Sequence, residues 1–289
     1  MGERVMHRPE TEEAHERAVA RVIGVMRERL YDGFSLTEMA EEGYMSPFHF
    51  NRVFRQVTGV PPVQFFGGLR LRRAKRLLAE TDASVTDVCF DVGYNSLGTF
   101  SRRFGELVGT SPSRFREIAR SGESGGPLPV VPSSAPVSTD PSGPGVFGRV
   151  AAAGYRGPVF VGLFEEGLPQ GRPAACAALA APGPFRLRPK ADGVYSLFAA
   201  GLGERPSPKT SLLCEDALRG GGRDCKVVVR GGRAGGPPIE VELRSPDPVD
   251  PPILLTLPVL IGEHLARNGD GGLADRRWRA AANGRPKGA

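Results

Sequence analysis

The chain has 289 residues, of which 40% are hydrophobic and 24% charged, so it can bury cores of ordinary globular size. It has no run of 18 apolar residues, which excludes a membrane-spanning helix. The formal net charge is +6, and it is unevenly spread, because residues 44–120 hold 12 Lys and Arg against 6 Asp and Glu while residues 1–43 hold 6 against 10. A positive excess concentrated in one segment is typical of a nucleic-acid-binding surface.

The amino terminus carries charges where a signal peptide needs an apolar core, so we expect a cytoplasmic protein. The four cysteines, at positions 89, 176, 214 and 225, form no CxxC pair. Structural zinc sites need paired ligands at short spacing. The sequence therefore predicts no metal and no cofactor, and it favours buried, reduced cysteines.

The first predicted helix covers residues 14–31, where apolar residues recur at helical spacing, and Gly33 is its expected end. A second, short helix begins after Ser35, whose side chain and that of Glu38 match a capping box. This helix is broken at Gly43.

The third helix is expected to begin at Ser46-Pro47 and to stop at Gly59, a natural left-handed cap. A longer helix follows over residues 62–79, with an apolar stripe and a basic face that includes Arg70 to Arg76. Gly67-Gly68 is a weak point in it, costing about 1 kcal/mol per Gly relative to Ala. The basic run is compatible with a DNA-facing surface or with a merely solvated one.

The next elements repeat this order fifty residues later. Ser84 caps a short helix, Gly93-Tyr94 forms the turn, and Asn95 or Ser96 caps a helix that runs to Val108. A last helix starts near Pro112. The segments NRVFRQVTGVPPVQFF (51–66) and SRRFGELVGTSPSRFR (101–116) share the same Arg, Phe, Gly and Pro pattern.

Each copy has the layout of a helix-turn-helix unit, whose second helix enters the major groove. The units span residues 35–58 and 84–108, and the first has one residue fewer before its turn, counted to the Gly-Tyr pair. The connecting helix of about 18 residues is about 27 Å long. Two recognition helices can then lie about 34 Å apart, one turn of B-DNA, and read two adjacent major-groove segments.

Residues 14–118 resemble the AraC/XylS-type DNA-binding domain. The motifs that carry the resemblance are LTEMAEEGYMSPFHFNRVFRQVTGVPPVQFFGGLRLRRAKRLLAET and VTDVCFDVGYNSLGTFSRRFGELVGTSPSRFR. The resemblance implies a transcription regulator, not an enzyme, with double-stranded DNA and RNA polymerase as its partners.

By the same resemblance, base contacts come from exposed positions early in each recognition helix: Phe48, Asn51, Arg52, Leu97, Gly98, Ser101 and Arg102. Arg and Asn suit guanine and adenine edges, whereas Leu97 and Gly98 offer no hydrogen bonds, so the second unit is expected to contribute less specificity. Phe48 could instead be a core residue, and Arg52 and Arg102 could anchor phosphates or pair with an acid such as Glu38 or Asp87.

We expect phosphate contacts from a second group of residues: His49, Arg55, Arg73, Arg103, Ser111 and Ser113. For the two serines the alternative is to cap the last helix, whose N-terminal amides could also face a phosphate. For His49, a surface position is favoured over a metal ligand.

The fold class expected is multidomain, with an all-α double helix-turn-helix domain at residues 9–120 and a mostly-β, sandwich-like domain at residues 149–262. A Pro/Ser/Gly-rich disordered linker, 121–148, separates them, and a disordered tail covers 263–289. We expect seven or eight antiparallel strands. The candidate strands are 157–164, 172–180, 184–189, 193–202, 210–214, 224–230, 238–244 and 251–261.

The second domain contains no catalytic motif, so a role in sensing a small molecule or docking a protein is expected. The sequence leaves two rivals open: a non-specific architectural DNA binder, and a DNA-repair protein with an alkyl-accepting cysteine. The operator sequence and the direction of regulation do not follow from the sequence.

Overall fold

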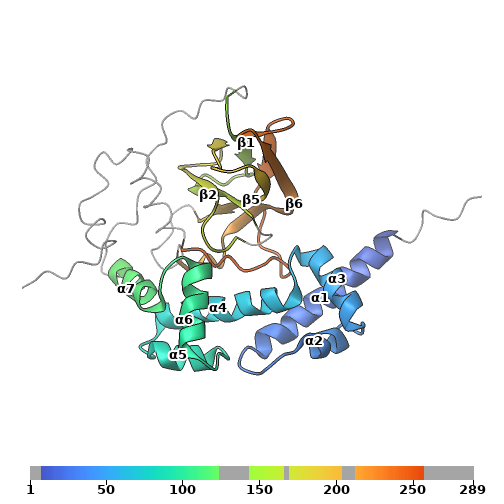
Figure 1. Cartoon of the computed structure of the whole chain (residues 1–289), viewed down its shortest axis with the longest axis vertical. Helices are drawn as coiled ribbons and strands as arrows, with labels where there is room; N and C mark the ends of the chain where they lie inside the picture. Colours follow the sequence, from blue (N-terminus) through green and yellow to red (C-terminus); the bar gives the residue numbers. More distant parts are fainter. Residues whose placement is uncertain (1–7, 124–142, 166–168, 204–211, 257–289) are drawn as a thin grey trace, which may run out of the picture.

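The computed structural model describes residues 8–123, 143–165, 169–203 and 212–256, with helices in the first part and strands in the second (Figure 1). Most of the predicted linker and the predicted tail lie outside the described residues. No helix in the described ranges is long and apolar enough to cross a membrane.

Seven helices form the described amino-terminal part, as the sequence predicts. They are α1 (Arg8–Glu28), α2 (Leu36–Glu42), α3 (Pro47–Thr58), α4 (Pro62–Glu80), α5 (Val85–Asp91), α6 (Leu97–Val108) and α7 (Pro112–Glu123). The helix α1 ends at Glu28, five residues before the predicted stop at Gly33. The carbonyls of Leu30 and Asp32, beyond this end, accept hydrogen bonds from Arg70 of α4 at 2.9 and 2.7 Å instead of continuing the helix.

The helix caps follow the sequence closely. Ser35 and Ser84 each accept a hydrogen bond from the third residue of the helix, and the acids Glu38 and Asp87 bond back to the cap amide, which completes two capping boxes. Ser46 and Ser96 cap α3 and α6 in the same way, with single bonds to His49 and Thr99. Gly59 and Gly109 end these two helices at φ values of 82° and 90°.

The two turns differ, but not where the sequence comparison places the difference. The residue with left-handed backbone is Tyr44 (φ 55°) in the first turn and Gly93 (φ 77°) in the second, and each lies nine positions after its capping serine. The extra residue of the second copy is Asn95, which follows the turn rather than preceding it. The Gly-Tyr pairs of the two copies are therefore offset by one residue, and Tyr44 corresponds to Gly93.

The helix α4 joins two hydrophobic cores. Its first half, with Phe65, Phe66 and Leu69, packs with α1, α2 and α3, and its second half, with Leu71, Ala74 and Leu78, packs with α5, α6 and α7. The helix continues through Gly67-Gly68 without a break. Gly68 allows Pro252 to pack closely against α4, because a Cβ at position 68 would lie 2.9 Å from Pro252 Cγ.

Eight strands are described: β1 (Val146–Ala151), β2 (Val159–Phe164), β3 (Ala175–Leu179), β4 (Pro184–Leu187), β5 (Gly193–Gly201), β6 (Leu218–Arg230), β7 (Arg233–Ala234) and β8 (Ile239–Glu242). They form a three-stranded sheet, β4-β1-β8, and a five-stranded sheet, β3-β2-β5-β6-β7. The expectation of antiparallel pairing throughout is wrong for β1 and β8, which pair in parallel.

Two candidate strands are also wrong. Leu212 and Leu213 are helical, and both side chains are buried against the core around the second half of α4. Residues 251–256 form no strand and lie as an extended segment with Leu254 in the same core, while 257–261 fall outside the described residues. Both segments are apolar because they cover the helices, not because they join a sheet.

The strand β2 explains how the strand-rich region meets the helical one. All six of its residues are buried, with Val159, Val161 and Leu163 in a core shared with β1, β4 and β8. Phe160 and Phe164 point to the other face, where they pack with residues such as Ile253 and Leu255. A continuous apolar strand of this kind is expected when both faces of a sheet are covered.

Candidate nucleic-acid interface

The first candidate surface is the amino-terminal half of α3. Phe50, Val53, Phe54 and Val57 bury one face of this helix. The opposite face exposes Phe48, Asn51, Arg52 and Arg55, and Phe48 is 84% exposed. A core role for Phe48 is therefore wrong, and its ring lies in solvent on the same face as the polar side chains.

Arg52 has a neighbour other than the acid considered from the sequence. Its Nη2 lies 3.3 Å from Nδ1 of His49, and the half-buried His49 ring meets His15 of α1 edge-on at 5.7 Å between centroids. Glu38 instead bonds Ser35 and Arg29, at 3.3 Å to the Arg29 Nη2. These hydrogen bonds hold the pKa of Glu38 below its usual value.

The second candidate surface is the amino-terminal half of α6. Leu97 is 40% exposed, Gly98 and Arg102 are exposed, and Ser101 is half-buried. Arg102 and Arg103 both lie near Glu106, at 3.5 and 3.8 Å. The acid beside Arg102 is therefore Glu106 and not Asp87, whose carboxylate accepts the Ser84 amide at 3.1 Å.

Two exposed aromatic side chains were missed by the sequence reasoning. Tyr44, in the first turn, is 87% exposed with the Arg21 guanidinium 4.9 Å from its ring centre. Phe90, near the end of α5, is 55% exposed. Their exposure could have been predicted from their position in or just before a turn, where the apolar face of a helix has ended and an aromatic residue is not needed for the core.

The basic run of α4 has three different environments. Arg70 bonds the loop after α1, as described above, while Lys75 is fully buried and its Nζ lies 3.4 Å from the Leu255 carbonyl. Burial lowers the pKa of Lys75 to about 8. Arg76 pairs with Glu215 of the strand-rich region, and Arg73 is half-buried. The carboxyl-terminal part of the chain thus contacts this face at Lys75 and Arg76.

The carboxyl-terminal ends of both α3 and α6 touch the strand-rich region, whereas their amino-terminal halves stay exposed. Thr256 donates to the Val108 carbonyl at 3.2 Å through its amide and through its hydroxyl, and the Gly171 amide donates to Leu107 at 2.8 Å. Val57 and Thr58 of α3 line a cavity shared with the strands. Arg27 of α1 adds a bond to Pro248.

The start of α7 resolves the alternative for one of the serines. The Ser111 hydroxyl accepts the Arg114 amide at 3.3 Å, so Ser111 caps this helix. Ser113, two residues later in the first turn of α7, is exposed.

Two of the four cysteines, Cys89 and Cys214, are buried. Burial raises the pKa of the Cys89 and Cys214 thiols, which reduces the thiolate that a nucleophile needs. Among the described residues, no group of three or more His, Cys, Asp or Glu could hold a metal ion.

Comparison with known proteins places these helices in a family. A family model described as a helix-turn-helix domain matches residues 39–118. The MmsAB operon regulatory protein of Pseudomonas aeruginosa is 39% identical over 100 residues, covering 35% of this chain and 33% of that protein. The "Probable transcription factor PqrA" of Proteus vulgaris is 30% identical over 86 residues, covering 30% of this chain and 70% of that protein.

Among solved structures, the DNA-binding domain of AdpA in complex with a target DNA is 32% identical, with a TM-score of 0.36, and the match covers 38% of this chain and 98% of that one. The chain belongs to the AraC family of DNA-binding transcription regulators. It spans about a third of the length of the first curated relatives it matches.

Proposed function

We propose that this protein is a sequence-specific transcription regulator whose two helix-turn-helix units, α2–α3 and α5–α6, read adjacent major-groove segments. The observation that carries the proposal is that α3 and α6 have the same caps at both ends and expose the same amino-terminal half. We assign residues 9–120 to the DNA-binding domain and the strand-rich region, with bounds of 149–262, to sensing or interaction.

The connecting helix α4 supports reading by one chain. Its 19 residues give a length of about 28 Å at 1.5 Å per residue, close to the spacing of successive major grooves on one face of DNA. It is also packed into both cores, so we expect the two units to move as one body. RNA polymerase is the partner expected for a regulator positioned in this way.

The two units contribute unequally in this proposal. Arg52 and Asn51 offer bidentate hydrogen bonds to guanine and adenine, and the exposed Phe48 suits a thymine methyl group. On α6, Leu97 and Gly98 offer shape and apolar contact, and Arg102 is partly engaged by Glu106. The residues proposed for phosphates are His49, Arg55, Arg73, Arg103, Ser111 and Ser113.

The test is selection of binding sites from random DNA, with the wild-type chain and with Arg52→Ala. We expect an enriched motif in two parts one helical turn apart. Arg52→Ala should cost about 1–3 kcal/mol on the best site and relax one base position. Arg149→Ala, which removes an exposed charge from β1, is the matched control and should leave the motif unchanged.

The outcomes separate this function from its rivals. No enriched motif, with a steep fall of affinity in salt, would indicate an architectural binder. Transfer of a labelled methyl group from alkylated DNA to a cysteine would indicate a repair protein. The raised thiol pKa values of Cys89 and Cys214 argue against the second rival.

A further inference from the structure

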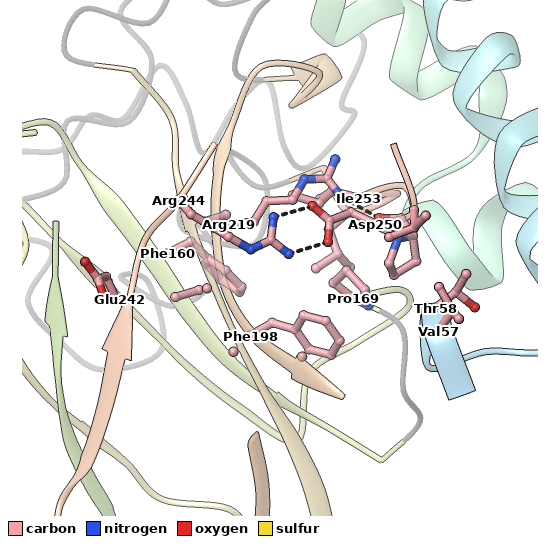
Figure 2. Close-up of a pocket in the computed structure, with 18 residues that line it drawn as sticks. Val57, Thr58, Phe160, Pro169, Phe198, Arg219, Glu242, Arg244, Asp250 and Ile253 are labelled. Carbon is pink, nitrogen blue, oxygen red and sulfur yellow. Dashed lines mark hydrogen bonds and ion pairs between the residues drawn. The ribbon is translucent and has the colours of Figure 1, made fainter. Parts of the chain in front are cut away.

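A cavity of about 300 Å³ lies where the five-stranded sheet meets the helices (Figure 2). It is lined by residues of β2, β5 and β6, by Glu242 of β8 and the following Arg244, by residues 249–255, by Pro169, and by the end of α3 at Val57 and Thr58. Its volume is at the lower end of the range found for small-molecule sites. The strand-rich region and the helix α3 therefore both border the cavity.

The cavity has one guanidinium that is matched by an acid and one that is not. Arg244 makes two parallel hydrogen bonds to Asp250, at 2.8 and 2.6 Å, and Figure 2 shows this pair beside Arg219. Arg219 donates from Nη1 to the Pro251 carbonyl at 2.5 Å, while its Nε is buried without a partner. Within the described ranges, no carboxylate forms an ion pair with Arg219.

A largely buried guanidinium without a carboxylate partner favours an incoming anion. Burial lowers the pKa of Arg219, and the nearby Asp250 offsets only part of this effect. Arg219 lines the cavity, and a carboxylate bound against its guanidinium would supply the charge that the protein leaves out, through the charge-assisted hydrogen bonds that Arg makes to carboxylates. The second acid of the wall, Glu242, lies apart from Arg219 in Figure 2.

The rest of the wall suits an apolar body. Phe160, Phe198, Ile253 and Leu255 contribute apolar surface. The backbone of Gly220 to Gly222 adds a stretch without side chains, and a Cβ on Gly222 would lie 3.4 Å from the Phe198 ring. An aromatic or branched group fits between these surfaces.

We propose that this cavity binds a small organic carboxylate with an apolar or aromatic body, its carboxylate on Arg219, and that occupancy alters DNA affinity. The effect on DNA affinity rests on the proposed function. The cavity is in direct contact with the DNA-binding helices, because the end of α3 forms part of its wall. In addition, the segment that lines it continues to Thr256, which bonds the end of α6.

The experiment measures ligand binding to the full chain without DNA, by calorimetry, and then DNA affinity with and without the ligand. The probes are phenylacetate, hexanoate and isovalerate at millimolar concentration, each beside its neutral amide. We expect at least one acid to bind and its amide to bind about tenfold or more weakly, as the loss of a charged hydrogen bond implies.

Two variants test the assignment from opposite sides. Arg219→Gln should weaken binding of the acid about tenfold, whereas Glu242→Gln, at an exposed wall position, should tighten it about twofold. Arg230→Gln, on the same strand but exposed and outside the cavity, is the matched control and should change nothing. Glu242→Gln keeps the test valid even if Arg219→Gln disturbs folding.

Three results would overturn the proposal: no binding of any of the three acids, equal binding of acid and amide, or an unchanged affinity in Glu242→Gln. Binding of the acid without any change in DNA affinity would refute only the coupling. A chain that binds no DNA motif but still binds the acid would remove the proposed function and leave the site in place.

Discussion

Replacing Gly93 with Ala should destabilise the protein more than the same change at Gly109, the glycine that ends α6. The residue has a φ of 77°, and a Cβ there would lie 2.7 Å from Arg70 Nη2 and 2.8 Å from the Leu30 carbonyl oxygen. The left-handed backbone costs Ala about 1–2 kcal/mol, and the overlap adds about 1–3 kcal/mol. The backbone oxygen cannot move away cheaply, because it already accepts a bond from Arg70.

Gly109→Ala is the matched control for this prediction. Gly109 has a φ of 90°, but no atom lies within 4 Å of the added Cβ, so only the backbone cost applies. Urea unfolding followed by circular dichroism gives the free energy of unfolding of both variants. We expect Gly93→Ala to lose about 1–3 kcal/mol more than Gly109→Ala. Equal losses would show that the close approach of Arg70 and Leu30 does not constrain this turn.

Two further predictions concern the contact between the helices and the strand-rich region. Lys75, whose pKa falls to about 8 from 10.5 on burial, binds fewer protons when folded than when unfolded, so its contribution to stability should rise between about pH 8 and 10. Lys75→Met should remove that rise and stabilise the protein at pH 7 by up to about 3 kcal/mol. The measurement is the difference in Tm between the variant and the wild type across this pH range, and Lys190→Met is the exposed control. The difference is needed because Cys214, Glu215 and Arg72 also face this amine. A double-mutant cycle of Arg76→Ala and Glu215→Ala should give a coupling free energy of about 0.2–1 kcal/mol, since both side chains are partly exposed. No measurable coupling in 50 mM salt would indicate that this ion pair does not hold the two parts together.

The features that the sequence predicted well are local. Capping serines, the acids three residues later and the terminal glycines act within one turn of the chain, so Ser35, Ser84, Gly59 and Gly109 could be identified with their roles. The family resemblance then extended these local signals to the order of the helices.

The features that were wrong depend on distant contacts. Lys75 is buried because a segment 180 residues away crosses α4, and no pattern around Lys75 indicates that. Leu212 and Leu213 look like a strand because they are apolar, yet they pack on α4. Phe48 could not be placed either, because helical spacing alone does not say where the apolar face ends. The parallel pairing of β1 with β8 joins segments about ninety residues apart.

The exposed Tyr44 has a consequence for how short a working fragment can be. In the second copy a glycine adopts the left-handed turn freely, but in the first copy a tyrosine does so, held by Arg21 of α1, which stacks on its ring and donates to the Glu42 carbonyl at 3.0 Å. The same helix buries Val22 and Met26 beneath the pair α2–α3. A fragment cut to residues 39–118, the span of the family match, would keep α3 and α6 but lose α1, whose Arg21 holds the first turn. Expression boundaries for this protein belong upstream of α1.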